Sequence, residues 1–351
     1  MKLNETPVRT SRNFRINNVK IDDFDVSDVP NNFCSVELLK DSSKVEITED
    51  SSTANLTFGL NKELESQVNE KANKNIKICI NSKSDNTTKV VFKFDKTNMG
   101  LVENIEIIAE ENTRATVVLK YESDDNKQYF HNGIIRLNAK DGSQINMIVV
   151  NLLNTKSNNF LAIENVLDEN ATVKYTLIDF GGKNSITNYY SNILGNCADN
   201  QLNAIYLGKE TQFFDLNYIG ELRGEKSNIN IEVQGALKDT AKKHFKGTID
   251  FKNGCKKATG NENENCLLLS DTARSLALPM LLCSEEDVEG NHSTSAGKVG
   301  EKELFYIMSR GFSLKEAQKL IVRAKFNKIL DCIKEDKLKE EILLEIDERL
   351  K

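Results

Sequence analysis

The sequence predicts a mainly β protein with an α-helical C-terminal region, and three observations lead to this prediction. Charged and apolar residues alternate over residues 36–100, as in Val90–Phe94, which is typical of short strands separated by polar loops. Polar turn signals then recur at intervals of roughly 27 to 30 residues up to about residue 285. From about residue 300 the apolar residues instead recur at helical spacing.

The first hundred residues are expected to form a separate N-terminal region. Residues 1 to about 35 sustain no hydrophobic period and read as irregular. Short strands are expected over the rest of this region, with one short helix between Asn61 and Asn73. The chain therefore divides into an N-terminal region at 1–100, a β core at 101–298 and a helical region at 299–351.

The β core has a loose internal repeat. Each unit holds an acidic or Asn-rich turn, a small residue and then alternating apolar positions. The units begin at Glu111, Asp141, Asp168, Ala198 and Gly224. A constant period of this kind suggests stacked coils, which bury a continuous core only by stacking on their neighbours. A β-sandwich also gives alternating strands that recur, so the spacing alone leaves a β-solenoid and a sandwich open.

The C-terminal region reads as a series of helices. Residues 301–310 have helical character, and Gly311 suits a helix C-terminus. Ser313 and Glu316 form a capping box, which predicts that a second helix begins there. Apolar residues at helical spacing follow at Ala317, Leu320, Ile321 and Ala324, and again at Leu338, Ile342, Leu343 and Ile346. The pattern fits two interpretations, a helical cap on the end of the solenoid or a docking surface for a partner.

Composition narrows the class of function. The formal net charge is −6, so we expect no nucleic-acid partner. No stretch approaches the roughly 18 apolar residues of a membrane span, and the N-terminus lacks the apolar core of a secretory signal. We therefore expect a cytoplasmic protein that does not associate with membranes. The seven cysteines form no CxxC pair, and we expect free thiols, mostly buried.

The motif search excludes several kinds of site. Neither a P-loop nor a GxGxxG motif is present, so the chain is not expected to bind ATP itself. The three histidines, His131, His244 and His292, have no zinc-ligand spacing. His131 is expected in a solvated polar turn and His244 at a strand edge.

Two clusters are candidate metal ligands. Asp287, Glu289 and His292 lie within six residues, and carboxylate and imidazole groups both bind iron. Glu264 and Cys266 are two residues apart before an apolar run, so on a strand they point to the same face. The simpler interpretation is a solvated acidic turn in the first case and a core cysteine beside a loop glutamate in the second.

The C-terminal part of the chain, from about residue 240 to 335, resembles the SufB/SufD family of iron–sulfur cluster assembly scaffolds. The segments that carry the resemblance are His244–Ile249, Leu267–Ala273, Pro279, Glu286–Val288 with His292, Leu304–Tyr306 and Ser309–Gly311. The resemblance implies a right-handed parallel β-helix core flanked by helical segments. It also implies a scaffold that is not a conventional enzyme and that helps to build an iron–sulfur cluster and pass it on.

The resemblance assigns the metal-site residues unevenly. His292 falls on the histidine that both branches of the family use near the subunit interface. The SufB branch has glutamates where this chain has Asn291 and Ser293, and a key cysteine where this chain has Glu264. The chain is therefore similar to a divergent SufB-like subunit of a minimal SufBC-type system. In that hypothesis it holds a transient iron–sulfur cluster through His292, Glu264 and Cys266, with Glu289 and Asp287 as further ligands.

The resemblance also implies partners. A SufC-type ABC ATPase is expected to dock on the helical region, and a second SufB/SufD-type subunit, either another copy or a paralogue, to pair with the β-helix. Apo iron–sulfur proteins would receive the cluster. The residues expected to dock the ATPase are Leu304, Phe305, Tyr306, Arg310, Phe312, Ala317 and Ile321.

Two rival functions stay open. One is a SufD-like structural partner that holds no cluster of its own. The other is a β-helix polysaccharide-active enzyme, which would use paired carboxylates such as Asp287 and Glu289.

Overall fold

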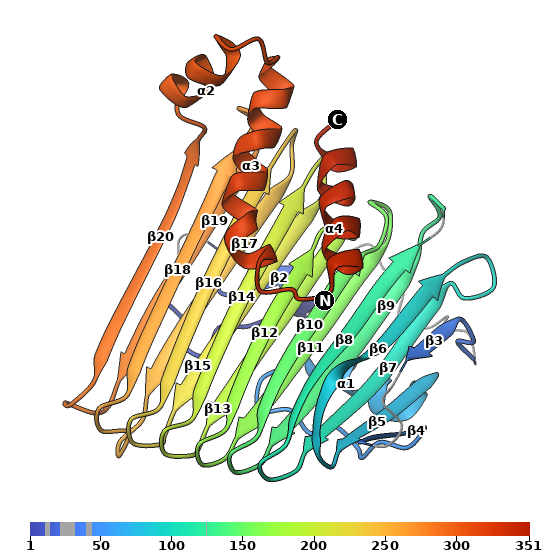
Figure 1. The fold of residues 1–351 in the computed structure, drawn as a ribbon, viewed down its shortest axis with the longest axis vertical. Helices are drawn as coiled ribbons and strands as arrows, with labels where there is room; N and C mark the ends of the chain where they lie inside the picture. Colours follow the sequence, from blue (N-terminus) through green and yellow to red (C-terminus); the bar gives the residue numbers. More distant parts are fainter. Residues whose placement is uncertain (11–14, 22–31, 40–43, 124) are drawn as a thin grey trace.

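Two nine-stranded sheets face each other along the central part of the chain (Figure 1). They belong to a computed structural model that describes residues 1–10, 15–21, 32–39, 44–123 and 125–351. Strands account for 51% of the chain, and the sheets form a parallel β-solenoid of about eight turns. The predicted fold class is therefore confirmed, and the sandwich alternative is wrong because strands one repeat apart pair in parallel.

Each turn of the solenoid contributes one strand to each sheet. The order in sheet I is β20-β18-β16-β14-β12-β10-β8-β6-β3, and the order in sheet II is β19-β17-β15-β13-β11-β9-β7-β5-β4. The parallel strands of sheet I are β6 (Lys83–Phe94), β8 (Arg114–Ser123), β10 (Gln144–Leu152), β12 (Thr172–Asp179), β14 (Asp199–Gly208), β16 (Asn228–Leu237), β18 (Thr259–Leu268) and β20 (Glu289–Lys298). Those of sheet II are β5 (Lys74–Ile80), β7 (Gly100–Ala109), β9 (Phe130–Ala139), β11 (Asn158–Leu167), β13 (Asn184–Ile193), β15 (Phe213–Leu222), β17 (Lys242–Phe251) and β19 (Arg274–Cys283).

The predicted turn signals mark one corner of the coils. Asn112, Gly142, Asn170, Cys197 and Lys226 all have a positive φ there, between 55° and 67°. The N–H of each donates to a carbonyl of the next coil, as from Asn112 to Asp141 at 2.9 Å. Glycine and asparagine are the residues that tolerate this left-handed conformation best, which is why Asn-rich turns mark the repeat.

The two ends of the solenoid differ. At the N-terminal end, β3 (Val36–Leu39) and β4 (Val45–Thr48) pair in antiparallel fashion with β6 and β5 and cover the first coil. Parallel pairing thus begins at β5, upstream of residue 101 where the sequence placed the start of the core. At the other end, β19 and β20 are the last strands of their sheets in the described part of the chain. Every residue of β20 is exposed or half-buried.

Apolar side chains from both sheets fill the interior of the coils. Aromatic rings form part of this core, with centroids 5.2 Å apart for Tyr175 and Tyr189 and 5.8 Å apart for Tyr218 and Phe245. His131 also lies inside. It is on β9 and fully buried, its Nδ1 is 2.6 Å from Asn159 and its Nε2 is 3.2 Å from Glu103. The expectation of a solvated His131 was therefore wrong.

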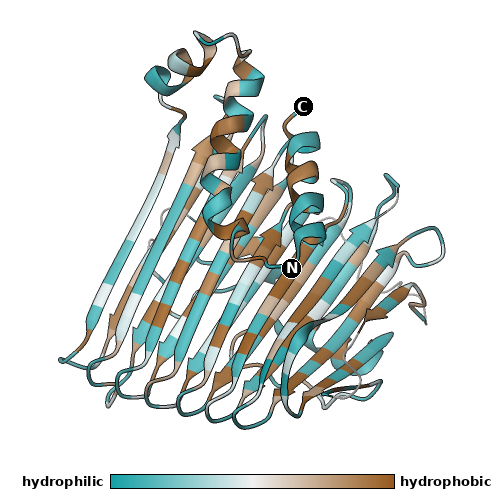
Figure 2. Cartoon of the chain, in the orientation of Figure 1, coloured by the Kyte–Doolittle hydropathy of each residue, from teal (hydrophilic) through white to brown (hydrophobic). Residues whose placement is uncertain are grey.

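Helices and the N-terminal segment cover the outer faces of the sheets. α3 (Leu314–Leu330) and α4 (Asp336–Arg349) pack on sheet I through residues such as Val322, Phe326 and Ile342. Both helices carry apolar as well as polar faces (Figure 2). They lie along the side of the solenoid, so the interpretation of these two helices as an end cap was wrong. The described helices include none that is long and apolar enough to cross a membrane.

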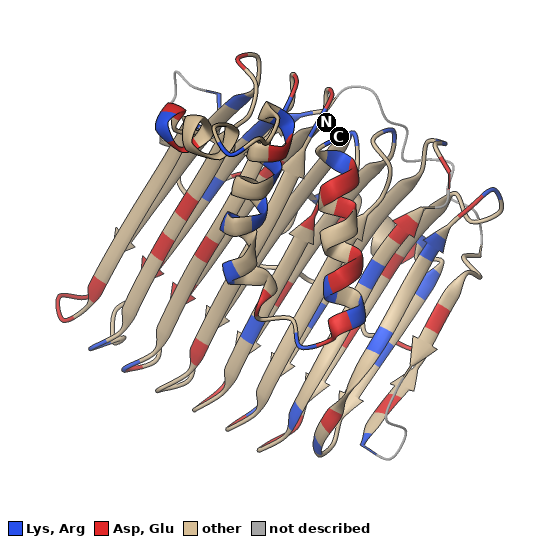
Figure 3. Cartoon of the chain, turned by 45° about the horizontal axis from the view of Figure 1, so that its top comes forward, with Lys and Arg blue, Asp and Glu red and all other residues tan. Residues whose placement is uncertain are grey.

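Both packed helices carry basic and acidic residues (Figure 3), and ion pairs join the two helices. Lys319 and Arg323 of α3 contact Asp347 of α4 at 2.9 and 3.3 Å. The predicted capping box is present, because Ser313 accepts from the N–H of Glu316 and the Glu316 carboxylate accepts from the N–H of Ser313. This box starts α3 directly after the turn at Gly311.

Sheet II is covered differently. α1 (Lys62–Lys71) lies within the predicted range of residues 61–73, and Asn61 caps it by accepting from the N–H of Leu64 at 2.8 Å. α1 packs on the outer face of β7 and β9. Two short antiparallel strands, β1 (Lys2–Leu3) and β2 (Val19–Lys20), belong to the N-terminal segment, which runs over the same outer face farther along the solenoid.

Candidate functional site

Three ionisable residues line the inner face of β18, next to the open end of the solenoid. Glu262, Glu264 and Cys266 alternate along the strand, and their exposed fractions are 2%, 0% and 3%. Alternate residues of a strand share a face, so all three point into the coil. Carboxyl groups in such a position lose their hydration and require compensation from the protein.

Glu264 receives that compensation from side chains of two other strands, β17 in the opposite sheet and β14 in the same sheet. Lys243 of β17 is fully buried, and its Nζ lies 2.8 Å from the Glu264 carboxylate. The Tyr206 hydroxyl donates to the same carboxylate oxygen at 2.8 Å. Burial and the adjacent Glu264 raise the pKa of Tyr206 well above its usual range. Glu264 therefore forms a buried ion pair, and binding a metal would require it to exchange Lys243 for the metal.

Cys266 lies beside this ion pair. Burial raises the pKa of the Cys266 thiol, while the nearby Lys243 ammonium acts in the opposite direction. The thiol is therefore protonated at neutral pH. Because the thiolate is the form that binds metals and attacks electrophiles, Cys266 would have to lose a proton on binding.

Glu262 has no such partner. Neither carboxylate oxygen has a hydrogen-bond partner among the described residues. Burial, with a contribution from Glu264, raises the pKa of Glu262 to about 8. The absence of a side chain at Gly247 makes room for this carboxyl, because a Cβ there would lie 2.2 Å from it. Glu262 is thus a protonated carboxylic acid at neutral pH.

His292 lies on β20 at the exposed edge of the last coil. Its Cα pairs in register with Glu262, so its side chain shares the inner face with Glu262. Glu289 is three residues earlier, pairs with Thr259 and lies on the opposite face of the strand. Asp287 precedes the strand. Within the described residues, no group of three or more His, Cys, Asp or Glu side chains is arranged to hold a metal ion.

The structure thus brings together part of the proposed ligand set. Glu264 and Cys266 share one buried site, and His292 lies beside Glu262 at its border. Sequence reasoning missed Lys243 and Tyr206 as members of this site and assigned no role to Glu262. The i, i+2 alternation already placed Glu262 on the face of Glu264, whereas the positions of Lys243 and Tyr206 depend on how coils stack.

The candidate docking residues separate into exposed and buried groups. α2 (Glu301–Met308) has no buried residue and projects beyond the ends of the strands (Figure 1). Phe305 and Tyr306 are 75% and 58% exposed, and the Arg310 guanidinium lies 4.7 Å from the Tyr306 ring centre. Phe312 is exposed and Leu304 is half-buried. Ala317 and Ile321 instead lie on the buried face of α3, so they cannot contact a partner in this arrangement.

Together the fold and the site define a helix-flanked parallel β-solenoid with a buried ionisable cluster beside an open end coil. Residues 91–325 match the family model described as "SUF system FeS cluster assembly, SufBD core domain". The chain therefore belongs to the SufBD family. This membership supports a role in iron–sulfur cluster assembly.

Relatives with curated names agree with this assignment. The iron–sulfur cluster assembly protein SufD of Bacillus subtilis is 24% identical over 275 residues, which are 77% of this chain and 62% of that protein. SufD of Escherichia coli is 22% identical over 68% of this chain and 57% of its own length. A SufBD family protein of Pyrococcus horikoshii is 33% identical over 44% of this chain and 34% of its own length. The match thus spans less than two thirds of each relative.

Proposed function

We propose that this chain is a scaffold subunit of a SUF-type assembly complex and that it acts with a SufC-type ABC ATPase. In this proposal α2 docks the ATPase, the open end coil pairs with a second SufB/SufD-type subunit, and the cluster is cargo held near that end before transfer to apo-proteins. Membership of the SufBD family supports the general role. The names of the relatives, all assembly proteins, support a function other than catalysis.

The observation that carries the docking part is the exposure of α2. This short helix has no fully buried residue and presents Phe305, Tyr306 and Met308 to solvent. Phe312 and Leu314 continue this exposed apolar surface. Contiguous exposed apolar residues rimmed by charge are typical of protein–protein contacts, and aromatic residues dominate the energy of such contacts.

The pairing part is supported by the edges of β19 and β20. Each of these strands pairs on one side within the described chain, so a row of N–H and C=O groups faces outward. Such an edge is a template for pairing with another strand. Both a second copy of this chain and a paralogue would fit this edge.

The docking proposal is tested by binding to the purified ATPase. We expect Phe305→Ala/Tyr306→Ala to weaken binding at least about tenfold, because each truncation removes a large aromatic contact. Leu39→Ala/Leu344→Ala is the matched control, since these two leucines are 64% and 66% exposed elsewhere on the surface. Equal affinities of both variants for the ATPase in calorimetry would rule out docking through α2.

The cargo proposal is tested by anaerobic co-expression with the ATPase, followed by iron and acid-labile sulfide analysis. We expect a coloured complex whose iron content falls in His292→Ala and in Glu264→Gln. Circular dichroism of each variant separates loss of binding from loss of fold. Unchanged iron and sulfide in both single variants and in the double variant would refute these residues as ligands.

One observation favours the second candidate, a SufD-like structural partner without a cluster of its own. The described residues hold no ready group of three metal ligands, and the Cys266 thiol is neutral. A chain of this kind would form a stable colourless complex with the ATPase that stays colourless after reconstitution. Colour would appear only when a SufB-type subunit is added.

A further inference from the structure

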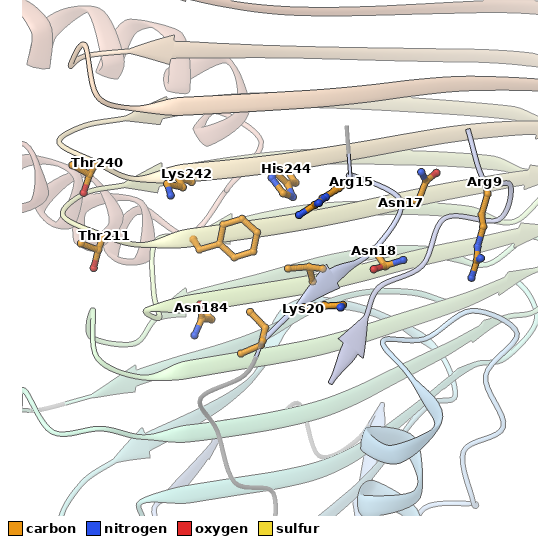
Figure 4. A pocket seen from close by; sticks show the side chains of 13 residues that line it. Arg9, Arg15, Asn17, Asn18, Lys20, Asn184, Thr211, Thr240, Lys242 and His244 are labelled. Atoms are coloured by element: carbon orange, nitrogen blue, oxygen red, sulfur yellow. The ribbon is translucent and has the colours of Figure 1, made fainter. Parts of the chain in front are cut away.

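A hollow on the outer face of sheet II is lined in part by β17, on the side of that strand opposite to Lys243. It has a volume of about 1000 Å³ and separates the N-terminal segment from the outer face of sheet II (Figure 4). The helices α3 and α4 cover the outer face of the other sheet. The proposed function therefore gives this hollow no role.

Basic side chains line the hollow from both sides. Arg9, Arg15 and Lys20 come from the N-terminal segment, and Lys242 and His244 come from β17 (Figure 4). None of the described residues that line it is acidic. This segregation is notable in a chain whose formal net charge is −6. A hollow lined by charges of one sign concentrates the field and raises the local concentration of counter-ions.

Most of this positive charge is uncompensated in the described part of the chain. Arg9 pairs with Glu5 at 3.0 Å, but no ion pair with a described acidic residue forms at Arg15, Lys20 or Lys242. On the side of sheet II, the Asp215 carboxylate lies 3.6 Å from the lining residue His244. That carboxylate is already balanced, because the buried Lys246 lies 2.5 Å from its Oδ1.

Asp215 also positions His244. Its Oδ2 lies 3.6 Å from His244 Nδ1, too far for a good hydrogen bond but close enough to orient the ring electrostatically. The Phe213 ring meets the His244 ring edge-to-face, with centroids 5.0 Å apart and planes at 89°. The imidazole is thus held between Phe213 and Asp215 at the wall of the hollow.

Buried polar contacts anchor the segment that forms the other wall. The Asn4 side chain donates to Asp215 Oδ1 at 2.6 Å, and Lys246 donates to the Asn4 carbonyl at 2.8 Å. Asn188 donates to the Asn4 side chain at 2.9 Å. All of these groups are buried. Asn4 therefore fixes the beginning of the N-terminal segment to sheet II, upstream of the basic residues that line the hollow.

The remaining lining supplies hydrogen-bond donors and an apolar floor. Amide or hydroxyl groups are present at Asn18, Asn184, Thr211 and Thr240. The apolar lining residues are Val19, Ile21 and Phe213. Guanidinium groups bind phosphate oxygens in pairs, and ammonium groups bind them as point charges. The combination fits a phosphate group better than a single-charge carboxylate, because several cations can share its charge.

We infer that this hollow between the N-terminal segment and sheet II binds a small phosphorylated anion, held by Arg15, Lys20, Lys242 and His244. The site is independent of the ATPase-docking surface and of the end coil. The sequence that follows Ile21 contains Asp22, Asp23, Asp25 and Asp28, which lie outside the described residues. The test therefore uses the full chain.

Calorimetric titration of the full chain with inorganic pyrophosphate, in a phosphate-free buffer of low ionic strength, tests the inference. We expect saturable binding at one site per chain. Lys20→Ala/Lys242→Ala should weaken it at least tenfold, and Arg15→Ala should weaken it independently. The control Lys174→Ala/Lys256→Ala removes the same charge from exposed lysines elsewhere and should change nothing.

Two results would overturn the inference. One is no saturable heat at millimolar pyrophosphate. The other is binding that both double variants weaken equally, or that neither weakens, because this would show a response to overall charge or a site elsewhere. Circular dichroism of each variant confirms that the fold is intact. Since ATPase binding is measured separately, either result leaves the proposed docking function untouched.

Discussion

Two glutamates on the same strand show how far local surroundings decide the state of a residue. Glu264 has a buried lysine and a tyrosine hydroxyl within 2.8 Å. Glu262, two residues earlier on the same face, has no hydrogen-bond partner among the described residues, and burial raises its pKa to about 8. The cost of burying a carboxyl is therefore met by an ion pair in one case and by protonation in the other.

The raised pKa of Glu262 predicts how stability depends on pH. The folded chain keeps this proton up to about pH 8, whereas the unfolded chain releases it near pH 4.5. The unfolded state therefore binds fewer protons than the folded state between these pH values. As a result, the contribution of Glu262 to the free energy of unfolding falls as the pH rises from about 4.5 to 8. Glu262→Gln mimics the protonated acid. It should raise the free energy of unfolding at pH 8 by at least about 1 kcal/mol over the wild type.

Urea unfolding at pH 5, 7 and 8 measures this difference, which should shrink toward pH 5. Glu225→Gln, an exposed corner residue, serves as the control and should show no such trend. A gain of the same size at pH 5 and pH 8 would show that Gln stabilises for another reason.

A second residue-scale prediction concerns Cys197. It occupies a corner with φ of 56°, where the equivalent corners carry Asn112, Gly142 and Asn170. The left-handed conformation is sterically unfavourable for cysteine, whereas asparagine adopts this conformation more readily. Cys197→Asn should therefore raise the free energy of unfolding by about 0.5 kcal/mol, measured by urea unfolding. Cys332→Asn is the control, because Cys332 has no positive φ.

At the scale of elements, α2 and α3 are neighbours along the chain with opposite surroundings. α3 buries Val322, Phe326 and Leu330 against sheet I, whereas α2 buries nothing. The apolar spacing in the sequence is similar for the two helices. Such spacing shows that a helix has an apolar face, but it does not show what covers that face. This explains why two of the expected docking residues, Ala317 and Ile321, proved to be buried.

Phe326 provides the test of how α3 is held. Its ring is fully buried and stacks on Phe180 with centroids 6.4 Å apart. Phe326→Ala should lower the free energy of unfolding by about 3 to 5 kcal/mol, as measured with urea. Leu320→Ala on the exposed side of the same helix should change it by less than about 0.5 kcal/mol. Similar losses in both variants would contradict packing of this face on the sheet.

At the scale of the whole molecule, the solenoid is closed at one end and open at the other. Antiparallel strands cover the first coil, while β20 leaves one edge unpaired within the described chain. The N–H of Glu289 donates to Ala258 of the adjacent coil at 3.0 Å, so N–H groups of odd-numbered residues point inward to β18. Those of even-numbered residues, such as Thr294, point to the open edge.

The open edge predicts that subunits pair through β20. Thr294→Pro removes an outward N–H and leaves the ladder to β18 intact, because proline is tolerated on an edge strand. It should reduce the dimer fraction, with itself or with a paralogue, in light scattering after size exclusion. Thr294→Val keeps the N–H and should pair as the wild type does. Dimers of unchanged stability in Thr294→Pro would place the interface elsewhere.

Much of this architecture was readable from the sequence for a physical reason. A period close to 30 residues, Asn and Gly at left-handed corners, and the capping box at Ser313 are local signals that need no knowledge of distant contacts. The corners found in the sequence lie at one edge of sheet I. The strands of sheet II were not resolved as separate members of each repeat, because their turns carry weaker signals.

The sequence by itself thus determined a repeating β core followed by helices and the shared face of Glu264 and Cys266, and its family resemblance pointed to the solenoid class. Only the tertiary structure decided that His131 is buried, that Lys243 pairs with Glu264, and that α3 lies on sheet I while α2 stays exposed. It also brought Arg15 and Lys242 to one hollow across more than two hundred residues. Each of these depends on which coils stack side by side, and hydrophobic period and turn chemistry carry no information about such long-range neighbours.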